Sequence, residues 1–535
     1  MLRNGTDETA STVHHATGFQ DVSTDSASSF QIVAHWLRTC LTRHDSCHFD
    51  RNPLLPTRVI DVGPSDGSKD PKLFITKGQR GIYVSLSYCW GDVPNVRTQI
   101  ETLDAFQKCI PLNIIPKTIR EAIIVTRRLG IRYLWVDTLC IVQDSTDDWL
   151  REAKGISSVY RDSVLTIAAS AADSLNSEGG LFRPRNRLRT RPFQFAPNIA
   201  PFDNPKRVFV FGDRRESRDA LRCESRLDTR GWVLQEQLLS SRTLNYSSQE
   251  LYWECSALNA SESYPAGIPR EYDANFERQR FAELKMNLRG SGVGLDKERM
   301  HMLWQDMVSL YSKRKLFIET DRLVALAGAA SQAAKIFEDK LLAGLWVKRL
   351  WRDLLWRVEG DVNSPNFLCV RQTEFKVPSW SWASIKGPIT FEDAWGTNRM
   401  KLYPCIQILN YDEKMDIKAN EVSGYVVVRG IVLSQLPLSL TQAVTPDLTD
   451  KSNYPSDLAN QARYWKPDTS GIPYQDVQYL IVAACRGHAV CLGIKPDQMH
   501  KGEYRRVGLA YARSIGWSNH LVLPTEVQSQ VITLI

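Results

Sequence analysis

The stretch from Ile131 to Ser170 restricts the fold more than any other part of the sequence. It opens with an almost unbroken apolar and aromatic run, IRYLWV, that ends at Asp137, as in strands that are covered on both faces of a parallel sheet. Ser145 and Asp148 form a capping pair at the start of a helix, and the apolar run VLTIAA then supplies a second buried strand. The sequence therefore predicts strand, loop, helix and strand, the repeating unit of an α/β fold.

One face of this helix is expected to pack on the sheet. Trp149, Ala153, Ile156 and Tyr160 recur at spacings of three and four, which predicts a single apolar stripe. Glu152 lies at the margin of that stripe. A carboxylate that is partly turned toward a core is either paired with a basic group or used in chemistry, and both alternatives stay open for Glu152.

A second strand and helix precede this stretch. IYVSLSYCWG alternates like a strand and ends in a glycine turn, and PKTIREAIIVTRRLG has the proline and glycine expected at the two ends of a helix. Right-handed crossovers place the carboxyl ends of parallel strands on one rim, where open α/β sheets bind ligands. We therefore expect Ser87, Tyr88 and Trp90 to share a rim with Asp137. The alternative for Asp137 is that it only caps the loop after its strand.

Composition limits the classes of function. The 67 basic and 60 acidic residues are scattered without a clustered basic face, so nucleic-acid binding is not expected. The 11 cysteines include no C-x-x-C pair, which favours reduced thiols and a cytoplasmic location. The sequence has no apolar run long enough to cross a membrane and no signal-peptide core at its start, so neither a membrane span nor secretion is expected.

Four residues near the N-terminus are candidate metal ligands. Cys40, His44, Cys47 and His48 have spacings that bring donors onto adjacent turns, and thiolate and imidazole are the donors that zinc prefers. The alternative is a buried cysteine with solvated histidines. Because the sequence shows no second ligand cluster elsewhere, we predict that these residues hold no structural metal.

The remaining pattern divides the chain into six parts. A helix with Glu236 precedes a hairpin through Leu244 and Tyr252. Glu236 is a further catalytic candidate, but a solvated or capping role is expected for it. We predict a disordered arm at 1–28, an N-terminal helix and strand at 29–78, the α/β domain at 79–258, a linker at 259–300, a helical Trp-rich region at 301–398 and an antiparallel β-rich module at 399–535.

Several motifs together resemble the fungal HET (heterokaryon incompatibility) domain family. They are YVSLSYCWG, RYLWVDTLCIVQD, SSVYRDSVLTIAAS, GGLFRPR, RGWVLQEQLLSSRTL and PSWSWAS. The core of the resemblance spans about 83 to 255. It implies a fungal cytoplasmic protein of self/non-self recognition, whose HET domain triggers growth arrest or programmed cell death together with protein partners.

HET domains are in turn similar to Toll/interleukin-receptor (TIR) domains. LSYCW matches the end of the first TIR strand, YLWVD the second strand, and DDWLRE the helix that carries the catalytic Glu of NAD-cleaving TIR domains. This resemblance implies a TIR-like or flavodoxin-like parallel sheet, Glu152 as the catalytic residue, and NAD as a substrate held by Ser87, Tyr88, Trp90 and Asp137. No cofactor is assigned from the sequence, and NAD enters only as a substrate. A death-signalling module that acts by assembly with partner proteins is the first function implied, and an NAD-cleaving enzyme or an accessory enzyme of secondary metabolism is the alternative. A homo-oligomer is a further expectation for the partners.

Overall fold

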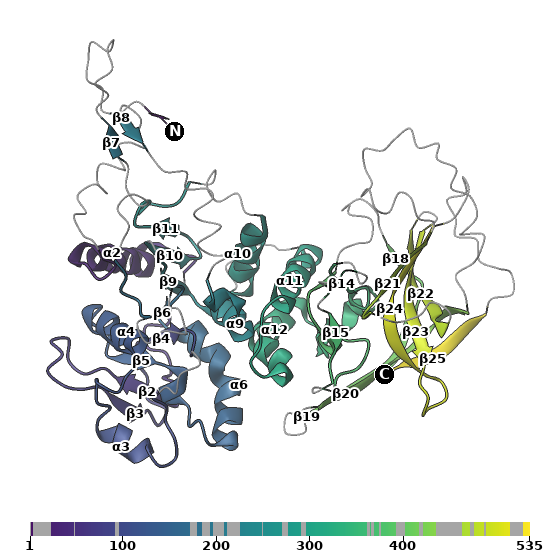
Figure 1. The fold of residues 1–535 in the computed structure, drawn as a ribbon, viewed down its shortest axis with the longest axis horizontal. Coiled ribbons are helices and arrows are strands. Elements are labelled where there is room, and N and C mark those ends of the chain that lie inside the picture. The colour runs from purple at the N-terminus through teal and green to yellow at the C-terminus, as the bar shows by residue number, and fades with distance from the viewer. Residues whose placement is uncertain are drawn as a thin grey trace, which may run out of the picture. The chain divides into compact units, whose positions relative to one another are not determined.

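The computed structural model of the chain forms two compact units, Met1–Leu295 and Asp296–Ile535, coloured along the chain in Figure 1. The boundary between the units falls inside the segment predicted as a linker. The residues that the structure describes are 2–3, 23–47, 49–90, 96–171, 179–184, 193–195, 208–210, 225–248, 250–269, 276–289, 296–360, 364, 367, 369–373, 376–391, 402–416, 421–434, 463–470, 476–485, 488–513 and 528–535.

The first unit is built on a mixed sheet of eight strands, in the order β11-β10-β9-β6-β4-β5-β2-β3 (Figure 1). Three further short strands, β1 (Leu2–Arg3), β7 (Phe193–Phe195) and β8 (Val208–Val210), form a separate small sheet. The strands of the large sheet are β2 (Arg58–Asp61), β3 (Lys72–Ile75), β4 (Tyr83–Ser87), β5 (Tyr133–Trp135), β6 (Leu165–Ala168), β9 (Arg242–Tyr246), β10 (Leu251–Cys255) and β11 (Asn259–Ser261).

The centre of this sheet is parallel and its two edges are antiparallel. β4 pairs in parallel with β5 and β6, and β6 with β9. The order β5-β4-β6-β9 is that of flavodoxin-like doubly wound sheets, in which the strand order reverses beside the first strand. The prediction that the strands near 83–88 and 133–136 are parallel neighbours is confirmed. Beyond this parallel core, β10, β11, β2 and β3 extend the sheet at both edges through antiparallel pairings, and β9 with β10 forms the predicted hairpin through Leu244 and Tyr252.

Helices lie on both faces of the sheet. Figure 1 shows α4 on one side of the strands and α6 with α9 on the other. The crossover through α4 runs from β4 to β5, and the crossover through α6 runs back from β5 to β6, so right-handedness places these two helices on opposite faces. Pro116 caps α4 and Gly130 follows it with a φ of 71°, a left-handed conformation that favours glycine. The helices are α2 (Ala27–Arg43), α3 (Leu103–Lys108), α4 (Lys117–Arg128), α5 (Asp137–Cys140), α6 (Thr146–Asp162), α9 (Gly231–Leu239) and α10 (Phe276–Leu288).

The start and end of α6 agree with the sequence, but its buried face does not. Ser145 Oγ accepts a hydrogen bond from Asp148 N at 3.2 Å, and the helix ends before Ser163. The predicted stripe is only partly correct, because Tyr160 is buried whereas its other members are half-buried. The most buried face is rotated toward Asp148 and Glu152, because a buried cation faces these two carboxylates.

The segments predicted as a linker and as a disordered arm contain ordered elements in the described part of the chain. The segment predicted as a linker contributes β11, in which Ser261 pairs with Tyr252, and the helix α10, where Lys285 Nζ lies 2.7 Å from Glu254 Oε1. Within the arm predicted at 1–28, Leu2–Arg3 form β1, and the buried Thr24 donates a hydrogen bond to the carbonyl oxygen of Leu181 at 3.1 Å. Residues 4–22 lie outside the described residues.

The second unit combines a helical part with a β-rich sheet, as predicted. Its helices are α11 (Lys297–Ser312), α12 (Val324–Phe337) and α13 (Leu350–Asp353). Short strands pair as β12 (Leu341–Leu342) with β13 (Leu345–Trp346), β14 (Arg357–Val358) with β17 (Ile389–Thr390), and β15 (Val370–Arg371) with β16 (Ile385–Lys386).

The large sheet of this unit closes on itself. Its order is β18-β22-β23-β24-β25-β20-β19, and β20 also pairs with β22. All pairings are antiparallel except that between β24 and β25. The strands are β18 (Tyr403–Pro404), β19 (Gln407–Asp416), β20 (Glu421–Leu433), β21 (Arg463–Pro467), β22 (Gln478–Cys485), β23 (His488–Pro496), β24 (Glu503–Arg513) and β25 (Ser529–Leu534). No helix in the described ranges of either unit is long and apolar enough to span a membrane.

Candidate functional site

The carboxyl ends of β4 and β5 carry a connected set of polar groups. Asp137 follows β5 as the first residue of α5, and its Oδ2 accepts a hydrogen bond from Trp90 Nε1 at 2.6 Å. Its Oδ1 accepts a second one from Thr138 N at 2.7 Å. The hydroxyl groups of Tyr88 and Thr138 lie 2.7 Å apart. The structure thus brings together Tyr88, Trp90 and Asp137, three of the rim residues that the sequence predicts.

Ser87 brings the helix α9 to the same place. It is the last residue of β4, beside β6, where the order of the parallel strands reverses. Its hydroxyl lies close enough to Glu236 of α9 to lower the pKa of that carboxyl in part. The contact is loose: within the described residues, neither Ser87 Oγ nor Glu236 Oε2 makes a regular hydrogen bond, although both atoms are fully buried.

Glu236 is the most perturbed carboxyl group of this set. The residue is half-buried, while its Oε2 atom is inaccessible to solvent. Burial raises the pKa of Glu236 to about 7, and the negative charge of Asp137 adds to this effect, whereas Ser87, Arg230 and Tyr160 oppose it. Glu236 therefore exchanges its proton near neutral pH, as a general acid or base must. The solvated role expected from the sequence is wrong for this residue.

Arg230 supplies the positive charge. It caps the start of α9 and donates a hydrogen bond to the carbonyl oxygen of Tyr88. Burial lowers the pKa of Arg230, but the nearby charges of Glu236, Cys89 and Asp137 outweigh burial and raise it. The guanidinium group therefore stays charged beside two carboxyl groups.

Asp137 and Tyr160 complete the set. Burial raises the pKa of Asp137, while the hydrogen bond from Trp90 and the charge of Arg230 oppose this shift. Burial also raises the pKa of Tyr160 well above its usual value, so its hydroxyl keeps its proton, and this hydroxyl donates to the carbonyl oxygen of Leu86 at 3.2 Å. We call these residues the strand-end cluster: Ser87, Tyr88, Cys89, Trp90, Asp137, Tyr160, Arg230 and Glu236.

Residues 83–236 match the family model described as "Heterokaryon incompatibility protein (HET)". This region of the chain is a HET domain. The matched region begins at the first residue of β4 and ends at Glu236, so every member of the strand-end cluster lies within the HET domain. No curated protein and no solved structure matches the chain.

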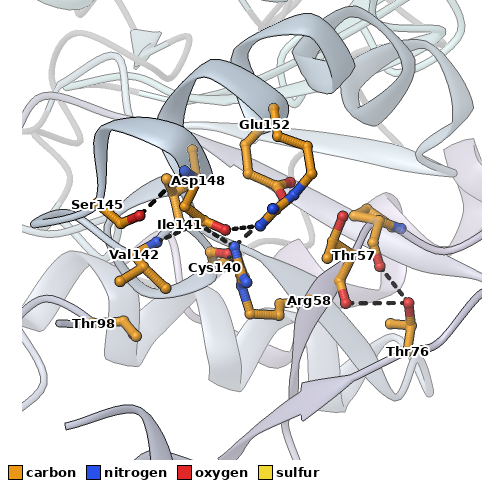
Figure 2. A network of polar contacts seen from close by, with 12 residues as sticks. Thr57, Arg58, Thr76, Thr98, Cys140, Ile141, Val142, Ser145, Asp148 and Glu152 are labelled. Carbon is orange, nitrogen blue, oxygen red and sulfur yellow. Dashed lines mark hydrogen bonds and ion pairs between the residues drawn. The ribbon is translucent and has the colours of Figure 1, made fainter. Parts of the chain in front are cut away.

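Glu152, the catalytic candidate taken from the TIR resemblance, is engaged elsewhere in the HET domain. Figure 2 shows it beside Asp148 and Arg58, which comes from β2. Arg58 Nη2 lies 3.4 Å from Glu152 Oε1 and also pairs with Asp148, while Arg58 Nε donates to the carbonyl oxygen of Cys140 at 2.6 Å. Arg151 Nε lies 3.5 Å from Glu152 Oε1. Glu152 therefore has the contacts of a carboxylate that is paired with basic groups, which is one of the two alternatives that the sequence leaves open for it.

From the sequence, a solvated or capping role is expected for Glu236 and Arg230 is not singled out, although the sequence contains a signal for both. Glu236 lies in GWVLQEQLL, a helix with apolar residues on most of its surface. A helix that is apolar all round is buried, so a carboxylate within it is forced into a poorly solvated place. Arg230, directly before that helix, and Arg242, after it, are the two equally near cations in the sequence.

Proposed function

We propose that this HET domain protein acts in fungal heterokaryon incompatibility, where it couples self/non-self recognition by cytoplasmic protein partners to programmed cell death. We further propose that its HET domain acts as an enzyme that cleaves the bond between nicotinamide and ribose in NAD. The family match supports the first part. The strand-end cluster supports the second, and the buried, unbonded Oε2 atom of Glu236 is the observation that carries it.

The chemistry of NAD cleavage suits this carboxylate. The bond from ribose C1′ to nicotinamide breaks with its electron pair moving to the ring nitrogen, which leaves an oxocarbenium-like sugar. A preorganised carboxylate stabilises that developing positive charge. Water then bonds to C1′ and gives its proton to the same carboxylate. Glu236, with a pKa raised to about 7, both carries negative charge at neutral pH and accepts a proton readily.

Other members of the cluster fit the rest of the substrate. NAD carries an anionic pyrophosphate, and a guanidinium group such as that of Arg230 binds phosphate oxygens with two parallel hydrogen bonds. Trp90 is half-buried, and its indole face suits a nicotinamide ring. The site lies where the strand order of the parallel strands reverses, the usual ligand position of doubly wound sheets. In this proposal Glu236 takes the catalytic role, and Glu152 serves stability.

The cellular part is tested by expressing the full-length protein in a fungal host while survival and NAD content are followed. We expect growth arrest preceded by loss of NAD for the natural sequence, and neither effect for Glu236→Gln. The matched control is Glu101→Gln, a carboxylate in the same domain that is exposed and outside the cluster. Growth arrest with unchanged NAD, equal for both variants, would contradict the enzymatic part and favour a non-catalytic assembly.

A further inference from the structure

Three thiols and one imidazole meet at the antiparallel edge of the first unit, away from the strand-end cluster. Cys40 lies in the last turn of α2, and His44 and Cys47 follow in the turn after that helix. Cys255 is the last residue of β10. One donor atom of each residue lies within 4.8 Å of the donor atoms of the other three. All three cysteines are free and buried.

The distances suit a tetrahedral metal ion. Cys255 Sγ lies 3.5 Å from His44 Nδ1. A zinc ion with bonds of about 2.3 Å to sulfur and about 2.0 Å to nitrogen separates these two donors by about 3.6 Å, and two sulfurs by about 3.8 Å. Small movements of side chains therefore bring all four donors to bonding distance from one central ion.

The charges around the four donors point to an anionic centre. Arg242 is completely buried, and its Nε donates to Cys40 Sγ at 3.1 Å while its Nη2 donates to the carbonyl oxygen of Cys47 at 2.6 Å. Among the described residues, no carboxylate forms an ion pair with Arg242. A buried cation needs a partner of opposite charge. Zn²⁺ with three thiolates and a neutral imidazole carries one net negative charge, which Arg242 balances.

A second arginine is held by the residues directly before Arg242. Arg289 Nη1 donates to the carbonyl oxygen of Ser240 at 3.4 Å, and Arg289 Nη2 donates to Ser241 Oγ. Two neighbouring cations repel each other in a poorly solvated place. Thiolates bound to a metal relieve that repulsion, whereas three neutral thiols do not.

We propose that Cys40, His44, Cys47 and Cys255 bind one structural zinc ion. Four protein ligands leave no open position, as in structural rather than catalytic zinc sites. The mixture of soft thiolates with one imidazole favours zinc over magnesium or calcium. The ion joins the end of α2 to β10. Its ligands His44 and Cys255 are 211 positions apart in the sequence, so the ion closes a long loop of the unfolded chain.

The helix α2 and the strand β10 are already in contact beside this site. The rings of Trp36 and Trp253 have centroids 6.2 Å apart, and Trp36 Nε1 donates to the carbonyl oxygen of Pro265 at 2.8 Å. The zinc ion therefore secures an existing interface. The prediction from sequence that no metal is held depended on the lack of a second ligand cluster. A single distant residue, Cys255, supplies the missing donor, and His48 lies outside the described residues.

The test measures metal in the purified full-length protein under reducing conditions. We expect about one zinc per chain, and a cobalt-substituted protein with thiolate-to-cobalt charge-transfer bands and the intense visible bands of a tetrahedral ion. Cys255→Ser is expected to lose most of this metal. Cys109→Ser, an exposed cysteine of the same unit, is the control and is expected to keep it.

His44→Cys keeps four donors and protects the test against misfolding of the serine variant. We expect it to retain the metal and to show stronger charge-transfer bands, because a fourth thiolate replaces the imidazole. Zinc far below one per chain after zinc is supplied, metal that survives Cys255→Ser, or a disulfide between two of the three cysteines in the reduced preparation would each overturn the proposal. None of these outcomes depends on whether the protein cleaves NAD.

Discussion

Arg58 of β2 and Glu152 of α6 form an ion pair of 3.4 Å in which each side chain is only 7% exposed. Asp148, one turn earlier in α6, pairs with the same guanidinium group and accepts a hydrogen bond from Val142 N at 2.8 Å. Figure 2 shows how Arg58 reaches both carboxylates. This pairing ties the antiparallel side of the sheet to the helix that covers it, and it explains why two carboxylates occupy the buried face of α6.

The first prediction concerns the stability of this network. Arg58→Met leaves Asp148 and Glu152 as buried carboxylates without their main cation, so we expect the free energy of unfolding to fall by about 3–5 kcal/mol. Glu152→Gln leaves the pair of Arg58 with Asp148, and we expect a smaller loss of about 1–2 kcal/mol. Urea unfolding followed by tryptophan fluorescence measures both losses.

A matched control is Arg80→Met, since Arg80 pairs with Asp50 at 3.7 Å with both side chains largely exposed. Such surface pairs contribute about 0–1 kcal/mol. The account of Glu152 fails if Glu152→Gln keeps full stability but loses NAD cleavage, because Glu152 would then be a catalytic residue after all.

The second prediction concerns pH and follows from the raised pKa of Glu236. Because the folded pKa of about 7 exceeds the ordinary value of 4.5, the folded state binds the proton more tightly than the unfolded state between these pH values. Stability from this group is therefore present below pH 4.5 and is lost as pH rises toward 7. Glu236→Gln removes the loss, so we expect it to exceed the natural protein in stability above pH 7 by up to about 3 kcal/mol.

Unfolding experiments at pH 5 and pH 8 measure this difference. The two proteins should be closest in stability at the lower pH and diverge at the higher one. A difference between them that is the same at both pH values would show that the carboxyl group of Glu236 titrates normally.

The third prediction separates the role of Arg230 from that of the carboxylates. Charge-assisted hydrogen bonds contribute about 1.5–3 kcal/mol, so we expect Arg230→Gln to raise KM for NAD by about tenfold to a hundredfold. Nicotinamide riboside has the same scissile bond but no pyrophosphate, and its KM should change much less. Steady-state nicotinamide release with both substrates provides the comparison.

Arg97→Gln is the control, because Arg97 is exposed and outside the strand-end cluster. Equal changes for the two substrates would contradict a pyrophosphate contact. Loss of the positive charge also removes one group that lowers the pKa of Glu236, so the pH profile of Arg230→Gln should move to higher pH.

The sequence was most informative where structure depends on neighbouring residues. The capping pair of Ser145 and Asp148, the helix after Pro116 and the parallel pairing of β4 with β5 all follow from local patterns. The rim residues Tyr88, Trp90 and Asp137 meet because crossover handedness fixes which strand ends are neighbours.

The features that the sequence did not predict depend on residues that are far apart in the sequence. Arg58 lies 94 positions before Glu152 and comes from an antiparallel strand, so nothing near Glu152 indicates the pairing. Cys255 is more remote still, since it lies 211 positions after His44. In both cases the role of the group depends on the charge or donor that the fold places beside it. Hydrophobic periodicity does not predict that neighbour.

The most direct test of the proposed activity is nicotinamide release from NAD by purified natural protein and by Glu236→Gln, measured from pH 5 to pH 9. We predict that the natural protein releases nicotinamide at a rate that rises through pH of about 7, as Glu236 loses its proton. We predict that Glu236→Gln stays folded and is slower by about a hundredfold or more at every pH. A natural protein that releases no nicotinamide, or a folded Glu236→Gln that keeps the natural rate, would contradict the central claim.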